Sequence, residues 1–418
     1  MDMLCDLIVD CEHKTAPPAE DGEYPLIRTP DIGVGRLLVE SAQRVTADTY
    51  RAWTKRAVPR PGDLILAREA PVGNVGIVRD GMEPVLGQRT VLIRPDASRL
   101  DPFYLNYLLS GPALRGWMEG VANGATVPHL NMADIRSMEL PPLPTLPAQR
   151  KIAAILSAYD DLIENNSRRI KLLEEMAQRI YREWFVKFRY PGHETVPLVE
   201  SELGPIPQGW RVAPMGNHVR VARGRSYRGV DLADGGGLPF VNLKCVARDG
   251  GFRADGVKRY IGEFKLAHRV VRGDIVVAVT DMTQERRLVA HAARIPELDE
   301  EFGIISMDLV KVVPTDVPGE YLHGTLRYSD FADEVKAHAN GANVLHLHPD
   351  RITEFRTVFP PRHLMQRYAA LVAPMEGLGD RLESGSERLR RARDLLLPRL
   401  ISGEIEVDEL NIAVSEAA

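Results

Sequence analysis

The 418-residue sequence has few cysteines, few aromatic residues and no long apolar run. Its three cysteines, Cys5, Cys11 and Cys245, are an odd number without CxxC spacing, which favours reduced thiols and a cytoplasmic location. No segment approaches the roughly 18 consecutive apolar residues of a membrane span, and the N-terminus lacks the basic start of a secretory signal. Hydrophobic residues make up 44% of the chain, which is enough for the cores of two or three domains.

Recognisable catalytic motifs are also missing. There is no phosphate-binding Gly-x-x-x-x-Gly-Lys-Ser/Thr loop, and Gly33-Val34-Gly35 and Gly235-Gly236-Gly237 do not continue into a dinucleotide fingerprint. His129 and His346 have no carboxylate or cysteine at metal-ligand spacing, so we expect structural roles for them. Glu12-His13-Lys14 has the Glu-x-Lys spacing of a nuclease metal site but lacks the usual upstream Pro-Asp pair. The sequence therefore predicts a binding protein with no catalytic residue, bound cofactor or metal.

What the chain does contain is an internal repeat. Ala122-Asn123-Gly124-Ala125 recurs 217 positions later as Ala339-Asn340-Gly341-Ala342, and His129-Leu130 recurs at the same offset. A shorter offset of 211 relates Gly62-Asp63 to Gly273-Asp274. Each copy begins with short strand-like segments and ends in a long amphipathic helix. We therefore expect an α+β protein that presents two similar surfaces.

In the first copy, the expected strands lie at 63–67, 75–78 and 90–93, and a helix capped by Asp101 is expected at 102–120. In the second copy, the expected strands lie at 239–242, 274–279 and 308–313. The predicted domains are 1–147 and 198–362, each followed by a helical segment, 148–197 and 363–418.

The two helical segments carry apolar residues at alternating spacings of three and four. Such spacing is typical of a coiled-coil seam. A helix over 148–189 would be roughly 60 Å long and needs a partner to cover its stripe. Residues 366–401 supply one, although Pro374 and nearby glycines predict a kink or a late start. Separate packing of each helix on its own domain is the alternative. The predicted seams are Ile152, Ile155, Tyr159, Leu162, Asn166, Ile170, Leu173, Ala177, Ile180 and Trp184, and Tyr368, Leu371, Met375, Leu378, Leu382, Gly385, Leu389, Ala392 and Leu396.

Basic residues are concentrated in one region, despite a net charge of −5. Residues 220–272 contain 12 Lys and Arg against 5 Asp and Glu, a local charge of +7. The segment 220–228 reads Arg-Val-Ala-Arg-Gly-Arg-Ser-Tyr-Arg. Guanidinium groups bind phosphates or guanine edges, and tyrosine contacts backbone or base. The alternative is a solvated turn. The predicted DNA contacts in this segment are Arg220, Arg223, Arg225, Tyr227 and Arg228.

Further candidate DNA contacts lie in the first copy and in the loops that follow equivalent strands. The loops 66–74 and 279–287 differ almost completely in polar residues, as two surfaces that read different sequences would, although ordinary loop drift explains this equally well. These further candidates are Lys14, Arg28, Arg68, Asn74, Thr280 and Gln284.

In combination, these motifs resemble the specificity (S) subunits of type I restriction–modification systems over nearly the whole chain. The matching segments are Gly124-Ala125-Thr126-Val127-Pro128-His129-Leu130-Asn131, Leu140-Pro141-Pro142-Leu143-Pro144 with Gln149-Arg150-Lys151-Ile152, Ile170-Lys171-Leu172-Leu173, Gly204-Pro205-Ile206-Pro207-Gln208-Gly209-Trp210, and the ending 395–405. Segment 13–78 is similar to one recurring class of that family's target recognition domain.

The resemblance implies two mixed α/β target recognition domains with pseudo-twofold symmetry, separated by two long helices packed as an antiparallel coiled coil. Each domain would read one half of a split, asymmetric double-stranded DNA sequence. The helices would dock two modification (M) subunits, which use S-adenosylmethionine to methylate adenine N6. Restriction (R) subunits would add cleavage that depends on ATP and magnesium. The alternatives are a stand-alone nuclease around Glu12 and Lys14, or a coiled-coil scaffold that binds only protein.

Overall fold

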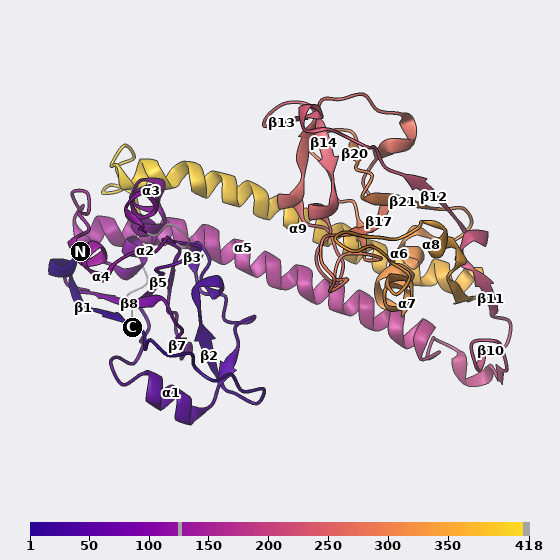
Figure 1. The fold of residues 1–418 in the computed structure, drawn as a ribbon, viewed down its shortest axis with the longest axis horizontal. Helices are drawn as coiled ribbons and strands as arrows, with labels where there is room; N and C mark the ends of the chain where they lie inside the picture. Colours follow the sequence, from indigo (N-terminus) through magenta and orange to yellow (C-terminus); the bar gives the residue numbers. More distant parts are fainter. Residues whose placement is uncertain (124–127, 413–418) are drawn as a thin grey trace. The chain divides into compact units, whose positions relative to one another are not determined.

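The computed structural model describes residues 1–123 and 128–412. The chain divides into two compact units, one made of Met1–Glu164 with Ser386–Ala418 (unit 1) and one made of Asn165–Gly385 (unit 2). Both units have mixed α/β content, and two long helices, α5 (Leu146–Tyr181) and α9 (Arg362–Ile401), each contribute residues to both (Figure 1). Within the described ranges, no helix is long and apolar enough to cross a membrane.

Unit 1 is built on a five-stranded sheet with the order β1-β8-β5-β6-β3, beside a three-stranded sheet β4-β2-β7. Alternate residues of β5 face opposite sides: Leu64 and Leu66 pack with the helices, whereas Ile65 and Ala67 pack with the β2 side. The elements of unit 1 are β1 (Cys5–Asp10), β2 (Tyr24–Ile27), β3 (Gly35–Arg36), β4 (Arg44–Val45), α1 (Ala47–Trp53), β5 (Leu64–Ala67), β6 (Val75–Ile77), β7 (Val85–Leu86), β8 (Thr90–Pro95), α2 (Pro102–Ser110), α3 (Pro112–Val121) and α4 (Met132–Ser137).

Unit 2 repeats this plan with a four-stranded sheet, β12-β21-β17-β19, and a five-stranded sheet, β13-β15-β14-β20-β16. The alternation recurs in β17, where Ile275 and Val277 face the helices and Val276 and Ala278 face the second sheet. The elements of unit 2 are β9 (Leu198–Val199), β10 (Ile206–Pro207), β11 (Arg211–Pro214), β12 (Val219–Arg223), β13 (Leu232–Ala233), β14 (Leu238–Val241), β15 (Lys258–Tyr260), β16 (Arg269–Val270), β17 (Ile275–Ala278), β18 (Thr280–Asp281), β19 (Ala292–Arg294), β20 (Gly303–Ile305), β21 (Leu309–Pro314), α6 (Gly319–Tyr328), α7 (Phe331–Lys336), β22 (Leu345–His346), α8 (Asp350–Glu354) and β23 (Arg356–Phe359).

The internal repeat is confirmed in the strand register. Leu66 pairs with Val91 between β5 and β8, and Val277 pairs with Val310 between β17 and β21. The turns before β5 and β17 are also alike, because Gly62 and Gly273 have φ values of 88° and 89°. A positive φ of this size is a conformation that favours glycine. The offset of 211 found in the sequence thus marks equivalent turns and strands.

The helix expected at 102–120 is instead two helices, α2 and α3. Asp101 caps α2 as predicted, since its side chain accepts a hydrogen bond from the amide of Tyr104 at 2.9 Å. The break falls at Gly111, whose ψ of 151° is extended. Pro112 follows, and a proline disfavours helical backbone in the residue before it.

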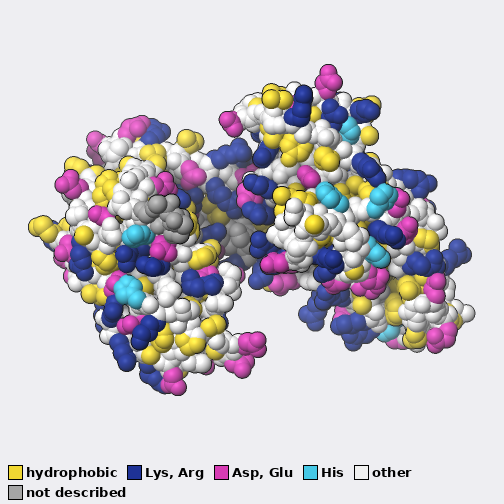
Figure 2. Space-filling view, in the orientation of Figure 1, with side chains coloured by type: hydrophobic (Ala, Val, Ile, Leu, Met, Phe, Trp, Pro, Cys, Tyr) yellow, Lys and Arg dark blue, Asp and Glu magenta, His cyan; other side chains and the backbone are white. Residues whose placement is uncertain are grey.

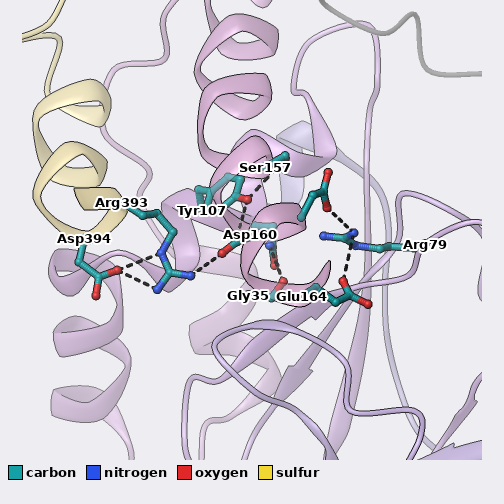
Figure 3. Close-up of polar contacts among 10 residues, drawn as sticks. Gly35, Arg79, Tyr107, Ser157, Asp160, Glu164, Arg393 and Asp394 are labelled. Carbon is teal, nitrogen blue, oxygen red and sulfur yellow. Dashed lines mark hydrogen bonds and ion pairs between the residues drawn. The ribbon is translucent and has the colours of Figure 1, made fainter. Parts of the chain in front are cut away.

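In unit 1, parts of α5 and α9 are held by a half-buried polar network (Figure 3). The Tyr107 hydroxyl donates to Asp160 of α5 at 2.6 Å, and Arg393 of α9 forms an ion pair with the same carboxylate. Burial, and next the charge of Asp160, raise the pKa of Tyr107, so its hydroxyl stays a donor. Arg79, which follows β6, forms a second ion pair with Asp161 at 2.8 Å.

In unit 2, aromatic residues hold the other ends of the same helices. Tyr181 of α5 and Tyr368 of α9 contact each other edge to face with ring centroids 5.8 Å apart. The Tyr181 hydroxyl donates to Thr325 of α6 at 3.1 Å. Gly324 is needed here, because a Cβ at that position would lie 2.6 Å from the Tyr181 ring. On the other side of α9, Asp380 pairs with Arg294 at 2.8 Å.

Two details of the predicted helices differ in the structure. Helix α9 begins at Arg362 and continues through Pro374, which excludes a late start; a kink at Pro374 stays a prediction. The predicted seams also deviate by one residue in places: Leu162 is 52% exposed whereas Ile163 is 4% exposed, and Leu371 is 43% exposed whereas Val372 is 1% exposed. Mixed three-and-four spacing allows both assignments, and the contacts made in each unit decide between them.

Candidate nucleic-acid interface

The repeated loop that precedes each long helix is closed by the same backbone bridge in both units. Asn123 and His129 exchange amide-to-carbonyl hydrogen bonds of 3.0 and 2.9 Å, and Asn340 and His346 do so at the same distances. The structural roles expected for His129 and His346 therefore include this backbone bridge. Residues 124–127 of the first loop lie outside the described residues. In the described part of the chain, no group of three His, Cys, Asp or Glu residues is arranged to hold a metal.

Arg68 and Asn74, which flank the loop between β5 and β6, are both buried. Arg68 is 9% exposed, and its Nε donates to the carbonyl of Leu130 at 2.7 Å. Asn74 is 8% exposed, and its amide nitrogen donates to the carbonyl of Ile32 at 2.8 Å. Because both side chains are buried and hydrogen-bonded to backbone carbonyls, the geometry favours a structural role for them and not a direct contact with a base.

The equivalent loop of unit 2 is organised by Asp281. This carboxylate is fully buried and accepts hydrogen bonds from the amides of Thr283 at 2.9 Å and Leu288 at 2.7 Å. Burial would raise the pKa of Asp281, but these hydrogen bonds outweigh it and the pKa is lowered. Thr280 is buried beside it, whereas Gln284 is exposed and donates to the carbonyl of Ala342 at 3.0 Å. Gln284 is thus the predicted contact of this loop that faces solvent.

The arginine-rich segment runs along β12 and continues past its end. Arg220 and Arg223 are exposed, with two Arg220 hydrogen bonds to backbone carbonyls. Arg228 has a side chain 82% exposed and only a long ion pair of 3.9 Å with Asp231. Tyr227 packs edge to face on Phe240, with centroids 4.7 Å apart, so its ring supports the second sheet. The structure therefore leaves most of these guanidinium groups available to an external anion.

Lys14 and Arg28 of unit 1 differ in their surroundings. Lys14 is exposed in the loop after β1. Arg28 follows β2 and pairs with the buried Asp31, with its Nε 2.9 Å from the carboxylate. Its charge is therefore already balanced within the protein. Of the two, Lys14 is the better placed to meet a phosphate.

Two surface residues near the arginine segment, Lys265 and Met307, were missed by the sequence analysis. Lys265 lies close enough to His268 to affect it: the pKa of His268 is lowered first by burial and then by the positive charges of Arg225 and Lys265. Met307 is 54% exposed, and its amide donates to the carbonyl of Arg225 at 2.8 Å. A parallel backbone bridge between Arg225 and Ser306 brings residues 225 and 307 together, so no local sequence pattern could have identified Met307.

On the displayed face of each unit, basic and acidic side chains alternate and no single-sign field covers the surface (Figure 2). In the part of unit 2 that contains β13 and β14, basic and apolar side chains lie side by side. Surfaces that mix cations with apolar groups suit nucleic acid, where phosphates and base edges are contacted together.

The chain thus contains two α/β units that share a strand framework and differ in their polar loops. Residues 10–175 match a family model described as the type I restriction modification DNA specificity domain. That part of the chain is therefore similar to the DNA specificity domain of type I restriction–modification systems.

Relatives of this chain include the type I restriction enzyme MjaIX specificity subunit of Methanocaldococcus jannaschii. The two are 24% identical over 400 residues, which cover 93% of this chain and 88% of the relative. The EcoBI specificity subunit of Escherichia coli is 26% identical over 142 residues, covering 33% of this chain and 30% of the relative. The crystal structure of a type I S subunit from M. genitalium has the same fold, with a TM-score of 0.60, 14% identity and coverage of 96% of this chain and 94% of that one.

Proposed function

We propose that this chain is the DNA-reading subunit of a type I restriction–modification complex and that its two units recognise the two halves of a split, asymmetric target. The observation that carries the proposal is the shared framework with unlike loops. Equivalent strands β5 and β17 lead into loops that start with Arg68-Glu69 in unit 1 and Val279-Thr280 in unit 2. Two different surfaces on one repeated framework suit two different half-sites.

We further propose that α5 and α9 form an antiparallel coiled coil that acts as the spacer. In unit 1, Asp160 of α5 contacts Arg393 near the end of α9. In unit 2, Tyr181 at the end of α5 contacts Tyr368 near the start of α9. Early residues of one helix thus meet late residues of the other, which supports opposite directions.

The proposed complex contains two modification subunits and restriction subunits docked on this chain. S-adenosylmethionine, ATP and magnesium would be used by those partners, and this chain would contribute binding and orientation without catalysis. The proposal places the protein in the cytoplasm, where these cofactors and cellular DNA are found.

Methylome sequencing tests the proposal. A host that expresses this chain with the modification subunit encoded beside it should acquire N6-methyladenine in one split, non-palindromic motif. The modification subunit expressed alone is the control and should leave that motif unmethylated. A palindromic or continuous motif, or methylation that does not require this chain, would contradict the proposal.

The alternative function, a stand-alone nuclease, predicts that the purified chain cleaves DNA without partner subunits. The Glu12 carboxylate lies 3.4 Å from the Arg56 guanidinium, which also pairs with Asp10, so Glu12 is already engaged in an ion pair within the protein. Purified chain incubated with magnesium and DNA should therefore leave the DNA intact. Cleavage that disappears in Glu12→Ala would instead support the nuclease.

A further inference from the structure

Strand register shows which residues of the two units occupy the same position at the ends of β1 and β12. Asp10 pairs with Val91 of β8, and Arg223 pairs with Val310 of β21. Because Val91 and Val310 are themselves equivalent through their pairing with β5 and β17, Asp10 corresponds to Arg223. Glu12 and Arg225 each follow two residues later in the chain, beyond the paired strands. The same place in the fold is thus acidic in unit 1 and basic in unit 2.

In unit 1 the two acidic residues share one arginine. Arg56 forms ion pairs with both Asp10 and Glu12. His13 lies 3.0 Å from the second oxygen of Asp10. A phosphate approaching this position would meet two carboxylates and one arginine that is already paired with both.

In unit 2 the corresponding cations have fewer close carboxylate partners. We name Arg223, Arg225, Arg228 and Lys265 the strand-end surface. Among the described residues, Arg223 is exposed and forms no ion pair with a carboxylate, and the Arg228 side chain is 82% exposed. Arg225 is half-buried, its side chain donates a hydrogen bond to Tyr260, and the more distant charges of Asp231 and Glu263 act on it. Apolar side chains flank these cations: Leu266 is 75% exposed, Val230 72% and Met307 54%. Exposed cations beside exposed apolar groups match the phosphates and base edges of a duplex.

Resting on the function proposed above, we infer that the strand-end surface of unit 2 is the phosphate anchor of this chain, whereas the matching surface of unit 1 contributes little to phosphate binding. Unit 2 then supplies most of the salt-dependent affinity and steers the first encounter with DNA. Unit 1 depends more on direct base contacts. The half-sites therefore differ in how they are bound as well as in sequence.

The test measures how the affinity of the assembled modification complex for its methylome-defined target varies with salt. Each lost phosphate contact lowers the slope of log K against log salt by about 0.9. Arg223→Ala/Arg225→Ala should therefore reduce the slope by about 2 and slow association at low salt. Arg223→Lys/Arg225→Lys keeps both charges and should restore the slope.

The matched control is Lys14→Ala/Arg56→Ala, which removes two cations around the equivalent position of unit 1. Its slope should fall by less than about 1, because Arg56 is already paired with carboxylates. An equal or larger fall in this control, or an unchanged slope in the Arg223/Arg225 variant, would overturn the inference. Size-exclusion chromatography of each complex checks that the variants fold and assemble.

The two proposals fail in different ways. If the wild-type complex methylates no split motif, the proposed function is wrong. If it methylates a split motif, but the salt slope does not depend on Arg223 and Arg225, only the anchor is wrong.

Discussion

At the scale of single residues, a substitution at Arg68 tests whether this side chain stabilises the fold or contacts DNA. Its buried guanidinium holds the carbonyl of Leu130. Arg68→Ala would leave that carbonyl without this donor, and we expect a loss of about 1 to 3 kcal/mol in the free energy of unfolding, measured with urea. Lys14→Ala, at an exposed position, should change it by no more than about 0.5 kcal/mol. Unchanged stability in Arg68→Ala together with lost methylation would point to a DNA contact instead.

Asp281 should make the stability of unit 2 depend on pH. Its pKa in the folded protein is lowered, so its carboxylate stabilises the fold above its ordinary pKa of 3.8, and this stabilisation is lost as the pH falls through the lower folded value. Asp281→Asn should therefore unfold at a lower temperature than the wild type at neutral pH. The difference should shrink in acid, as thermal unfolding at several pH values would show. A constant difference across this range would exclude the carboxylate charge as the cause.

At the scale of elements, the contact between Asp160 of α5 and Arg393 of α9 should couple the two helices in unit 1. Removing one partner breaks the half-buried ion pair and, among the described residues, leaves Arg393 with only Asp394, or Asp160 with only the Tyr107 hydroxyl, so Asp160→Asn and Arg393→Met should each destabilise the protein. The double variant should be less destabilised than the sum of the two, with a coupling of about 0.5 to 3 kcal/mol. Chemical unfolding of all four proteins measures this value. Simple additivity would mean that the ion pair does not hold the helices.

The same elements show what the sequence could predict. Short strands such as β5 and β17 were predicted closely, because Gly-Asp turns and apolar runs are local signals. The seam assignment failed at Leu162 and Leu371 because two adjacent stripes of one helix are almost equally apolar. Arg68 is hydrogen-bonded to Leu130, 62 residues away, and Met307 is hydrogen-bonded to Arg225, 82 residues away. No local sequence pattern predicts such contacts.

At the scale of the whole molecule, the proposed coiled coil of α5 and α9 would set the distance between the two half-sites. We predict that spacer length can be changed without changing what each unit reads. A matched insertion of about seven residues in both α5 and α9 keeps the heptad phase and adds about 10 Å, close to three base pairs. The insertions belong where each helix passes from one unit to the other, near residues 164–165 of α5 and 385–386 of α9.

Methylome sequencing of a host that carries this double insertion with the modification subunit measures whether the helices set the spacing. We predict a motif with the same bases in both half-sites and an unread gap longer by about three base pairs. An unchanged gap, or altered bases in either half-site, would contradict this prediction.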